Sequence, residues 1–380
     1  MIGSTPRRKW RSTLALLFTL SLLAPVMAAS PTPQDVGYLE GRILELTPTR
    51  PGDDIGAGGT ASVRLTDGSL VIATVPAAAM YGVTSIEPFQ VGDMVEMYFS
   101  PSPSSAGRDF VVVDWVRRPS LLWLTGLFLL VIVAVARLKG LRAFIATGAS
   151  LAIVITFIVP RILDGWNPML VSLLGAGGIL ILAIYFVHGL SWSTSAALIG
   201  TFAAVVMTML LGVAFMQISH LTGLGSEEAM MITLNASQIN MRGLLLAGLL
   251  VGALGALTDT TIVQASVVRE LAHVDPTLPW TSLYRSGMRV GHDHIGSLVN
   301  TLVLAYVGAG LPLMVVLSLG NFTIQRALNI ELVAVEVVHT LVGSIGLILA
   351  VPITTALAAV MFSGDRLKLR HGELDHGHKH

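Results

Sequence analysis

Two patterns of hydrophobic and polar positions divide the chain near residue 117. From residue 37 to residue 116, apolar and polar residues alternate in short runs separated by turn residues, which predicts β-strands. From Pro119 onward, long apolar runs replace the alternation, and such runs predict helices that span a membrane. The sequence therefore predicts a small β domain followed by an all-α membrane bundle.

The alternating segment, residues 37–116, predicts five or six strands in a small barrel or sandwich. Asp67-Gly68 lies between two alternating runs and is typical of a hairpin turn. Loops are predicted at Pro51–Thr60 and Pro101–Gly107, where turn residues gather. An OB-like barrel is compatible with this strand count. The domain could bind a ligand or serve an unknown partner, but nucleic acid is not expected, because basic and aromatic residues do not cluster.

About seven transmembrane helices are predicted, and eight remain possible. The apolar runs lie at Pro119–Ala136, Ala143–Pro160, Pro168–Val187, Thr194–Met216, Gly243–Leu257, His294–Leu317 and Glu331–Phe362. We expect the fifth run to continue as a helix through Leu271 and the last to bend at Pro352. A polar connection at 217–241 and an interfacial helix at Asn321–Ile330 complete a bundle that covers residues 119–362.

The two ends of the chain carry patterns that concern location. Residues 1–29 combine a basic start, a short apolar core and small residues at a cleavage site, as in a secretory signal peptide. An uncleaved anchor is the alternative. Residues 30–36 form a predicted linker. Basic residues near the short loops favour an extracytoplasmic β domain and a cytoplasmic, His-rich tail at 363–380.

Composition agrees with a membrane protein and narrows its chemistry. Hydrophobic residues make up 53% of the chain and charged residues 12%, about half the share usual in soluble domains. The formal net charge is zero and there is no cysteine, so neither a polyanionic partner nor thiolate chemistry is expected. No phosphate-binding loop, nucleophile elbow or HExxH motif occurs, so the sequence predicts no enzyme and no cofactor.

Two of the predicted helices carry narrow polar stripes. At 100° per residue, Gly248, Gly252, Gly255, Ser266 and Glu270 fall within about 40° of Asp259. Asp293, Ser297 and Asn300 share a similar arc on the next helix, which also carries Gly296. The sequence predicts that the glycines allow close helix packing, with a polar seam buried between the two helices.

The polar residues in these helices are the candidate site. Candidates for binding an ion or solute are Asp259, Ser266, Glu270, Asp293, His294, Asn300, Glu336 and His339. Each has a structural alternative: Asp259 could cap a break in its helix, Asp293 could cap a helix N-terminus, and Asn300 could bridge two helices. Glu336 and His339 are spaced to interact directly. In the tail, His376, His378 and His380 are weak metal-binding candidates beside the default of a disordered segment.

Three blocks of sequence carry a family resemblance. They read GALGALTDTTIVQAS at 252–266, SGMRVGHDHIGSLVNTLVLAYVG at 286–308 and GSIGLILAVPITTALAA at 343–359. In this order, after a β-rich segment, they resemble the YibE/F family of bacterial membrane proteins. The family commonly has GRD where this chain has Gly291-His292-Asp293, so no role of that arginine is carried over. The resemblance implies a multi-span, permease-like protein and no particular substrate.

These observations predict a permease or secondary transporter of an unknown small solute or ion, driven by a proton or cation gradient through intramembrane carboxylates. The alternative is a non-transporting membrane scaffold or envelope assembly factor whose exported β domain binds a partner. The lipid bilayer is the expected surrounding in either case, and a homo-oligomer is possible.

Overall fold

The computed structural model describes residues 37–48, 58–77, 89–101, 108–320 and 322–363. The chain divides into two compact units, Met1–Val135 and Ala136–His380. The predicted signal segment, the linker, most of the two predicted loops and the His-rich tail beyond Ser363 lie outside the described residues.

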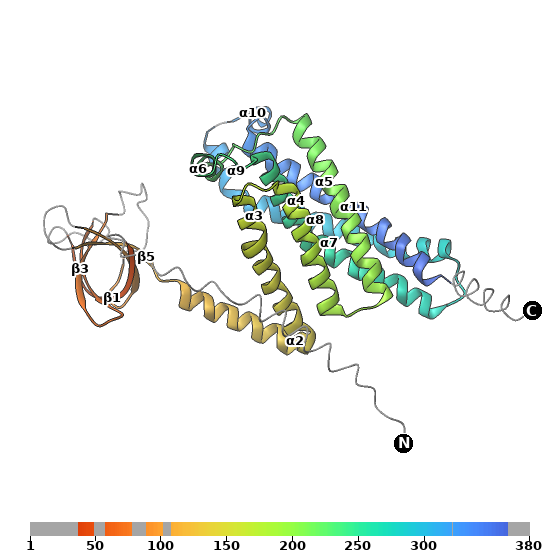
Figure 1. The fold of residues 1–380 in the computed structure, drawn as a ribbon, viewed down its shortest axis with the longest axis horizontal. Helices are drawn as coiled ribbons and strands as arrows, with labels where there is room; N and C mark the ends of the chain where they lie inside the picture. The colour runs from red at the N-terminus through yellow and green to blue at the C-terminus, as the bar shows by residue number, and fades with distance from the viewer. Residues whose placement is uncertain (1–36, 49–57, 78–88, 102–107, 321, 364–380) are drawn as a thin grey trace, which may run out of the picture. The chain divides into compact units, whose positions relative to one another are not determined.

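Five strands of the first unit form a closed barrel (Figure 1). They are β1 (Gly37–Pro48), β2 (Gly59–Leu65), β3 (Leu70–Val75), β4 (Met94–Pro101) and β5 (Arg108–Trp115). The order around the barrel is β1-β2-β3-β5-β4, and β3 pairs with β5 in parallel while the other pairs are antiparallel. The structure therefore confirms a barrel rather than a sandwich, with the five strands of an OB-type Greek-key barrel.

Alternation along the strands produces the barrel core. Ile43, Val63, Ala73, Val95 and Met97 are fully buried and come from four different strands. The predicted hairpin joins β2 to β3: the Ser69 amide donates to Asp67 Oδ1 over 2.8 Å. Between these two residues, Gly68 has a φ of +89°, a conformation that glycine adopts without steric cost.

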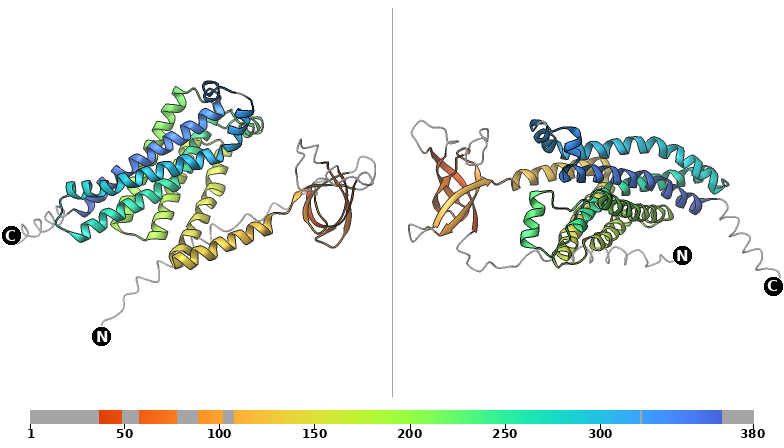
Figure 2. Two further views of the ribbon diagram at one scale, coloured as in Figure 1. Left: turned by 180° about the vertical axis from the view of Figure 1, so that it is seen from behind. Right: turned by 90° about the horizontal axis from the view of Figure 1, so that it is seen from above.

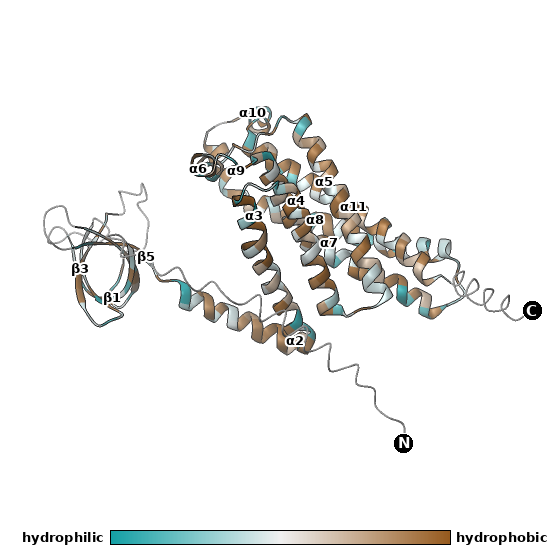
Figure 3. Cartoon of the chain, in the orientation of Figure 1, coloured by the Kyte–Doolittle hydropathy of each residue, from teal (hydrophilic) through white to brown (hydrophobic). Residues whose placement is uncertain are grey.

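Helices make up the rest of the chain. They are α2 (Arg118–Ile153), η4 (Val154–Ile158), α3 (Val159–Leu163), α4 (Pro168–Ile181), η5 (Leu182–Phe186), α5 (Trp192–Ile218), α6 (Glu227–Asn235), α7 (Met241–Val274), α8 (Trp280–Ala309), α9 (Leu311–Leu319), α10 (Ile324–Leu328) and α11 (Glu331–Phe362). Among the described residues, five helical stretches are long and apolar enough to cross a membrane, or six if the bent pair α8 and α9 is one span. Most of their turns are hydrophobic (Figure 3).

The predicted sixth span differs from the observed helix. The sequence predicts a helix over His294–Leu317, whereas α8 begins at Trp280 and ends at Ala309, and α9 continues from it at an angle of 57°. Pro279 precedes the first turn of α8, and a second proline, Pro312, lies in the first turn of α9, where proline is tolerated. Asp293 is therefore in the middle of a helix, and the prediction that it caps a helix N-terminus is wrong.

Helices α5 and α11 lie side by side in the second unit (Figures 1 and 2). Their contact is made by glycines facing threonines. A Cβ atom added at Gly200 would lie 2.2 Å from Thr354 Oγ1, and one added at Gly346 would lie 2.0 Å from Thr208 Oγ1. Side chains larger than hydrogen do not fit there, so these two glycines let the helices approach closely.

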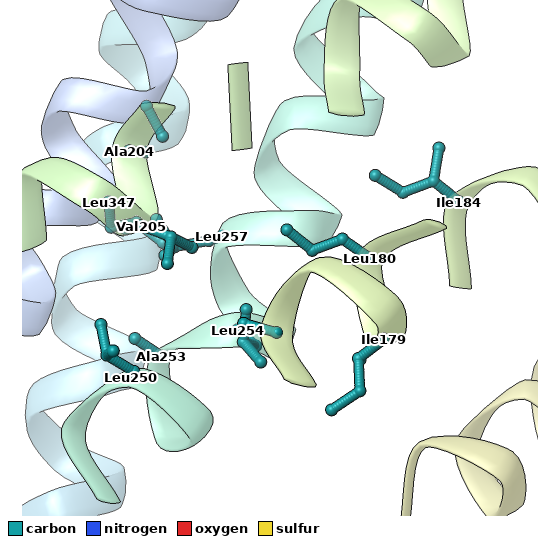
Figure 4. Close-up of a cluster of buried hydrophobic side chains, with 12 residues drawn as sticks. Ile179, Leu180, Ile184, Ala204, Val205, Leu250, Ala253, Leu254, Leu257 and Leu347 are labelled. Atoms are coloured by element: carbon teal, nitrogen blue, oxygen red, sulfur yellow. The ribbon is translucent and has the colours of Figure 1, made fainter. Parts of the chain in front are cut away.

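The main apolar cluster joins α4, η5, α5, α7 and α11. Figure 4 shows Leu254 of α7 beside Ile179 and Leu180 of α4. Leu180, Leu257 and Leu347 are all at most 1% exposed, so the centre of the helical unit is closely packed and apolar. Helix α7 is central to it, because its buried side packs against α4, α5, α8 and α11.

The glycine stripe of α7 lies on the other side of that helix. Gly248, Gly252 and Gly255 are exposed, and an added Cβ at Gly248 or Gly255 would have no atom within 4 Å. Gly296 of α8 is equally open, and only Gly252 has a neighbour, the Tyr306 hydroxyl at 3.2 Å. Within the part of the chain that the structure describes, the predicted close packing at Gly248, Gly255 and Gly296 is therefore not present. It occurs instead at Gly200, Gly346, Gly287 and Gly291.

Candidate functional site

The two polar stripes do not form one buried seam. Asp259 is exposed on α7, and Asp293, Ser297 and Asn300 are exposed on α8. The buried side of α8 carries Leu283, Gly287 and Gly291, and Asp293 lies about 200° around the helix from Gly291. The predicted seam is therefore corrected: α8 packs on its neighbours through glycines, and its carboxylate and amide point away from that contact.

Gln264 occupies the position where a polar contact between helices does occur. Its Nε2 atom donates to the Gly287 carbonyl oxygen over 2.9 Å and to Thr355 Oγ1 over 2.7 Å. An added Cβ at Gly291 would lie 3.2 Å from the same nitrogen. One buried amide thus connects α7, α8 and α11, a role that the sequence assigned to no residue at this position.

Asp259 lies within electrostatic range of His188, which follows the α4–η5 helix. Its carboxylate favours the cationic form of the imidazole. His188 follows η5 by two residues, and α5 begins four residues later. The structure therefore places Asp259 near a histidine that is not among the candidate residues predicted from the sequence.

A polar cavity of about 320 Å³ opens beside this pair. Its lining residues are mostly cationic or hydroxyl-bearing and come from α2, the η5–α5 connection, α5 and α7: Lys139, Arg142, Val187, His188, Gly189, Ser191, Ser193, Thr194, Ala197, Ile262, Ser266 and Arg269. Of the candidate residues, only Ser266 lines it. The cavity lies at the low end of the volumes usual for small-ligand sites, so a small solute would fill it.

Burial separates the inner part of the cavity from its rim. Ser193 and Thr194 are buried, with 3% and 7% of their surface exposed, whereas Lys139, Arg142 and His188 are exposed. Thr194 accepts from the Ser191 amide over 2.8 Å and donates to the Gly189 carbonyl, which fixes the start of α5. Lys139 and Arg142 therefore lie at the entrance of the cavity, and the hydroxyls of Ser193 and Thr194 lie deeper.

Of the three cationic side chains that line the cavity, one has an ion-pair partner among the described residues. Arg269 forms an ion pair with Glu270, with Nη2 and Oε1 2.8 Å apart, so this candidate acid serves to hold the arginine. Among the described residues, neither Lys139 nor Arg142 forms an ion pair. Desolvation by the surrounding protein and the neighbouring Lys139 ammonium lower the pKa of His188, and the carboxylate of Asp259 opposes them.

The remaining candidates lie apart from this cavity. Glu336 lines a second, largely apolar cavity of about 240 Å³ with Tyr306 and Thr340. His339 is directed elsewhere, toward the Leu245 backbone, and no ion pair joins it to Glu336 within the described residues. His294 is half-buried beside Asp293 without a contact to the cavity.

Metal binding has no support among the described side chains, where no three His, Asp or Glu residues are grouped closely enough to hold an ion. The tail histidines His376, His378 and His380 lie outside the described residues.

The comparison with known families identifies the helical part. A family model described as YibE/F-like protein matches residues 124–364, more than half of the chain and nearly all of its helices. No curated protein matches the chain.

Proposed function

The chain belongs to the YibE/F-like family, and from that premise we propose that it is a permease of the bacterial inner membrane. In this proposal it moves a small solute, and a proton or cation gradient drives the movement through Asp259. The observation that supports it best is the polar cavity of about 320 Å³ at one end of an otherwise apolar bundle.

Desolvation is the physical reason for this assignment. Charged and hydroxyl groups inside a membrane bundle are costly unless they face water, each other or a solute. The helix that lines the cavity with Ser266 and Arg269 also carries Asp259 two turns away, on the exposed face that includes Gly252 and Gly255. A carboxylate on that face is a suitable place for a coupling ion or proton to bind and leave.

Seven crossings fit the observed helices. The stretch Arg118–Leu163 has 46 residues, about 69 Å of helix, which is more than twice the hydrocarbon thickness of about 30 Å. Arg137 interrupts it with φ 52° and ψ −137°, which supports two spans. Counting α8 and α9 as one broken span gives seven in total, with Lys139, Arg142 and Arg269 on the cytoplasmic side and the barrel outside.

The role of Asp259 is tested with reconstituted protein. Currents are recorded on a solid-supported membrane while the outer solution is switched from sodium chloride to sodium phosphate, ammonium chloride or an amino-acid mixture. Wild type should give a current with at least one solution, and Asp259→Asn should abolish it. Asp164→Asn is the matched control, because Asp164 is an exposed carboxylate at the end of α3, outside the cavity. The proposal fails if no solution produces a current, or if Asp259→Asn conducts like wild type.

A scaffold remains the second candidate, because the barrel is an independent unit with an apolar outer patch. Leu70 and Ile72 alternate along β3 and are 65% and 72% exposed. Such a patch suits a protein partner. Replacing both residues by threonine should then abolish the cellular function while leaving the solute currents intact, an outcome that the permease proposal does not predict.

A further inference from the structure

We propose that the cavity binds a doubly charged phosphate group, held by Lys139, Arg142 and Arg269 at its rim and by the hydroxyls of Ser193 and Ser266 within. That the cavity is a site for a transported solute rests on the proposed permease function. Binding of phosphate to the cavity can be measured without measuring transport.

The charge of the cavity selects for a dianion. Three cationic side chains line it, and among the described residues one carboxylate pairs with them: Glu270, whose Oε1 lies 2.8 Å from Arg269 Nη2. This leaves two positive charges without an ion-pair partner among the described residues. A phosphate group carries a charge of about −1.5 to −2 at pH 7, so its charge matches that excess.

Two hydroxyl groups of the cavity are available as hydrogen-bond donors. Ser193 is only 3% exposed and lines the cavity, and its hydroxyl has no hydrogen-bond partner among the described residues. The Ser266 hydroxyl, on the facing helix α7, is unpaired in the same sense. Neither oxygen is among the described buried side-chain atoms that have no partner, so both hydroxyls face the open cavity, where a phosphate oxygen would accept a hydrogen bond from each.

Cation selection is unfavourable in the same place. Among the described residues, no carboxylate lines the cavity, and Asp259 is not part of the lining. A metal or ammonium ion would enter among three like charges, which repel it. The arginines, by contrast, present planar forks of donors that match phosphate oxygens.

The binding test uses the full chain in nanodiscs that contain only phosphatidylcholine, titrated with inorganic phosphate in a calorimeter. Wild type should bind one phosphate per chain. The double variant Lys139→Gln/Arg142→Gln should weaken binding at least tenfold, and Ser193→Ala should weaken it severalfold without changing the thermal midpoint. Arg285→Gln is the control, since Arg285 is an exposed arginine of α8 outside the cavity and should leave binding unchanged.

A second arm separates a free anion from a lipid headgroup. Native mass spectrometry measures phosphatidic acid, a phosphomonoester that can carry two negative charges, retained by wild type and by the double variant. Phosphate binding lost in the double variant supports a soluble anion. Retention of phosphatidic acid that the double variant loses, with no phosphate binding, supports a headgroup with the same chemistry. If wild type binds neither, or if the double variant and Arg285→Gln bind like wild type, the inference is overturned.

Failure of this inference differs from failure of the permease proposal. If the protein binds no phosphate but gives solute currents that depend on Asp259, the phosphate site is rejected and the permease proposal stands. Phosphate binding that depends on Lys139 and Arg142, in a protein without any current, would reject transport and leave the site in place.

Discussion

Gln264 Nε2 lies 2.7 Å from Thr355 Oγ1, so a buried amide joins α7 to α11 at the level where α8 also packs. The Thr355 hydroxyl in turn donates to the Val351 carbonyl over 2.6 Å. Gln264 Nε2 also donates to the Gly287 carbonyl oxygen of α8. One side chain therefore fixes the relative positions of three helices, α7, α8 and α11.

Gln264→Leu should therefore destabilise the helical unit by about 1–3 kcal/mol, since it leaves buried acceptors without their donor. Thermal or denaturant unfolding in detergent measures the change. A double-mutant cycle with Thr355→Val isolates the pair, and a coupling of about 0.5–2 kcal/mol is expected. Additive effects of the two substitutions would show that the hydrogen bond does not stabilise the fold.

Gly346→Ala should destabilise the fold by about 1–3 kcal/mol, because the added carbon would lie 2.0 Å from Thr208 Oγ1. Gly248→Ala is the matched control on a neighbouring helix. It meets no atom within 4 Å, and alanine favours a helix over glycine by about 1 kcal/mol. Thermal midpoints should fall for the first and hold or rise for the second. The reverse order would contradict the assignment of the packing seam to α5 and α11.

Acidification should lower stability through His188. Its folded-state pKa lies below the ordinary value of 6.5, so the unfolded chain takes up a proton at higher pH than the folded chain does. Stability is then lost as the pH falls from about 6.5 through the lowered folded value. Thermal midpoints measured between about pH 7.5 and about pH 5 should fall more for wild type than for His188→Gln. Parallel curves would show that His188 is not the responsible group.

Hydrophobic pattern predicted the barrel well, because alternation along a strand directly determines which side chains fill a closed barrel. Ile43, Val63 and Met97 are buried as the alternation requires. In the bundle, periodicity correctly placed Gly248, Gly252 and Asp259 on one face of α7, but it cannot say which face of an apolar helix its neighbours cover. The predicted packing face is the exposed one.

The candidate site was only partly accessible from the sequence for a similar reason. Ser266 was named from its helical position, and it does line the polar cavity. Lys139, Arg142 and Arg269 are recognisable in the sequence as basic residues near short loops. That pattern predicts the orientation of the chain in the membrane, but not that these three side chains line one cavity. Their convergence depends on four segments meeting, and Gln264 was missed because a buried amide has no local signature.

Water access to the polar face of α7 tests the central claim most directly, and the cysteine-free chain is a suitable background. Gly255→Cys and Asn300→Cys place thiols on the exposed faces that carry Asp259 and Asp293, while Met207→Cys is the control on α5. Because Thr201 contacts Thr261 and Gly212 faces Leu246, Met207 lies at the depth of Gly255, and it is 40% exposed.

Each variant, in native membranes, is treated with a charged, membrane-impermeant thiol reagent, which reacts only with thiols that water reaches. A water-filled route predicts labelling of Gly255→Cys and Asn300→Cys at least tenfold faster than of Met207→Cys. If neither is labelled faster than the control, and Asn300→Cys instead cross-links between two chains, the polar face is a dry contact between copies and not a path for a solute.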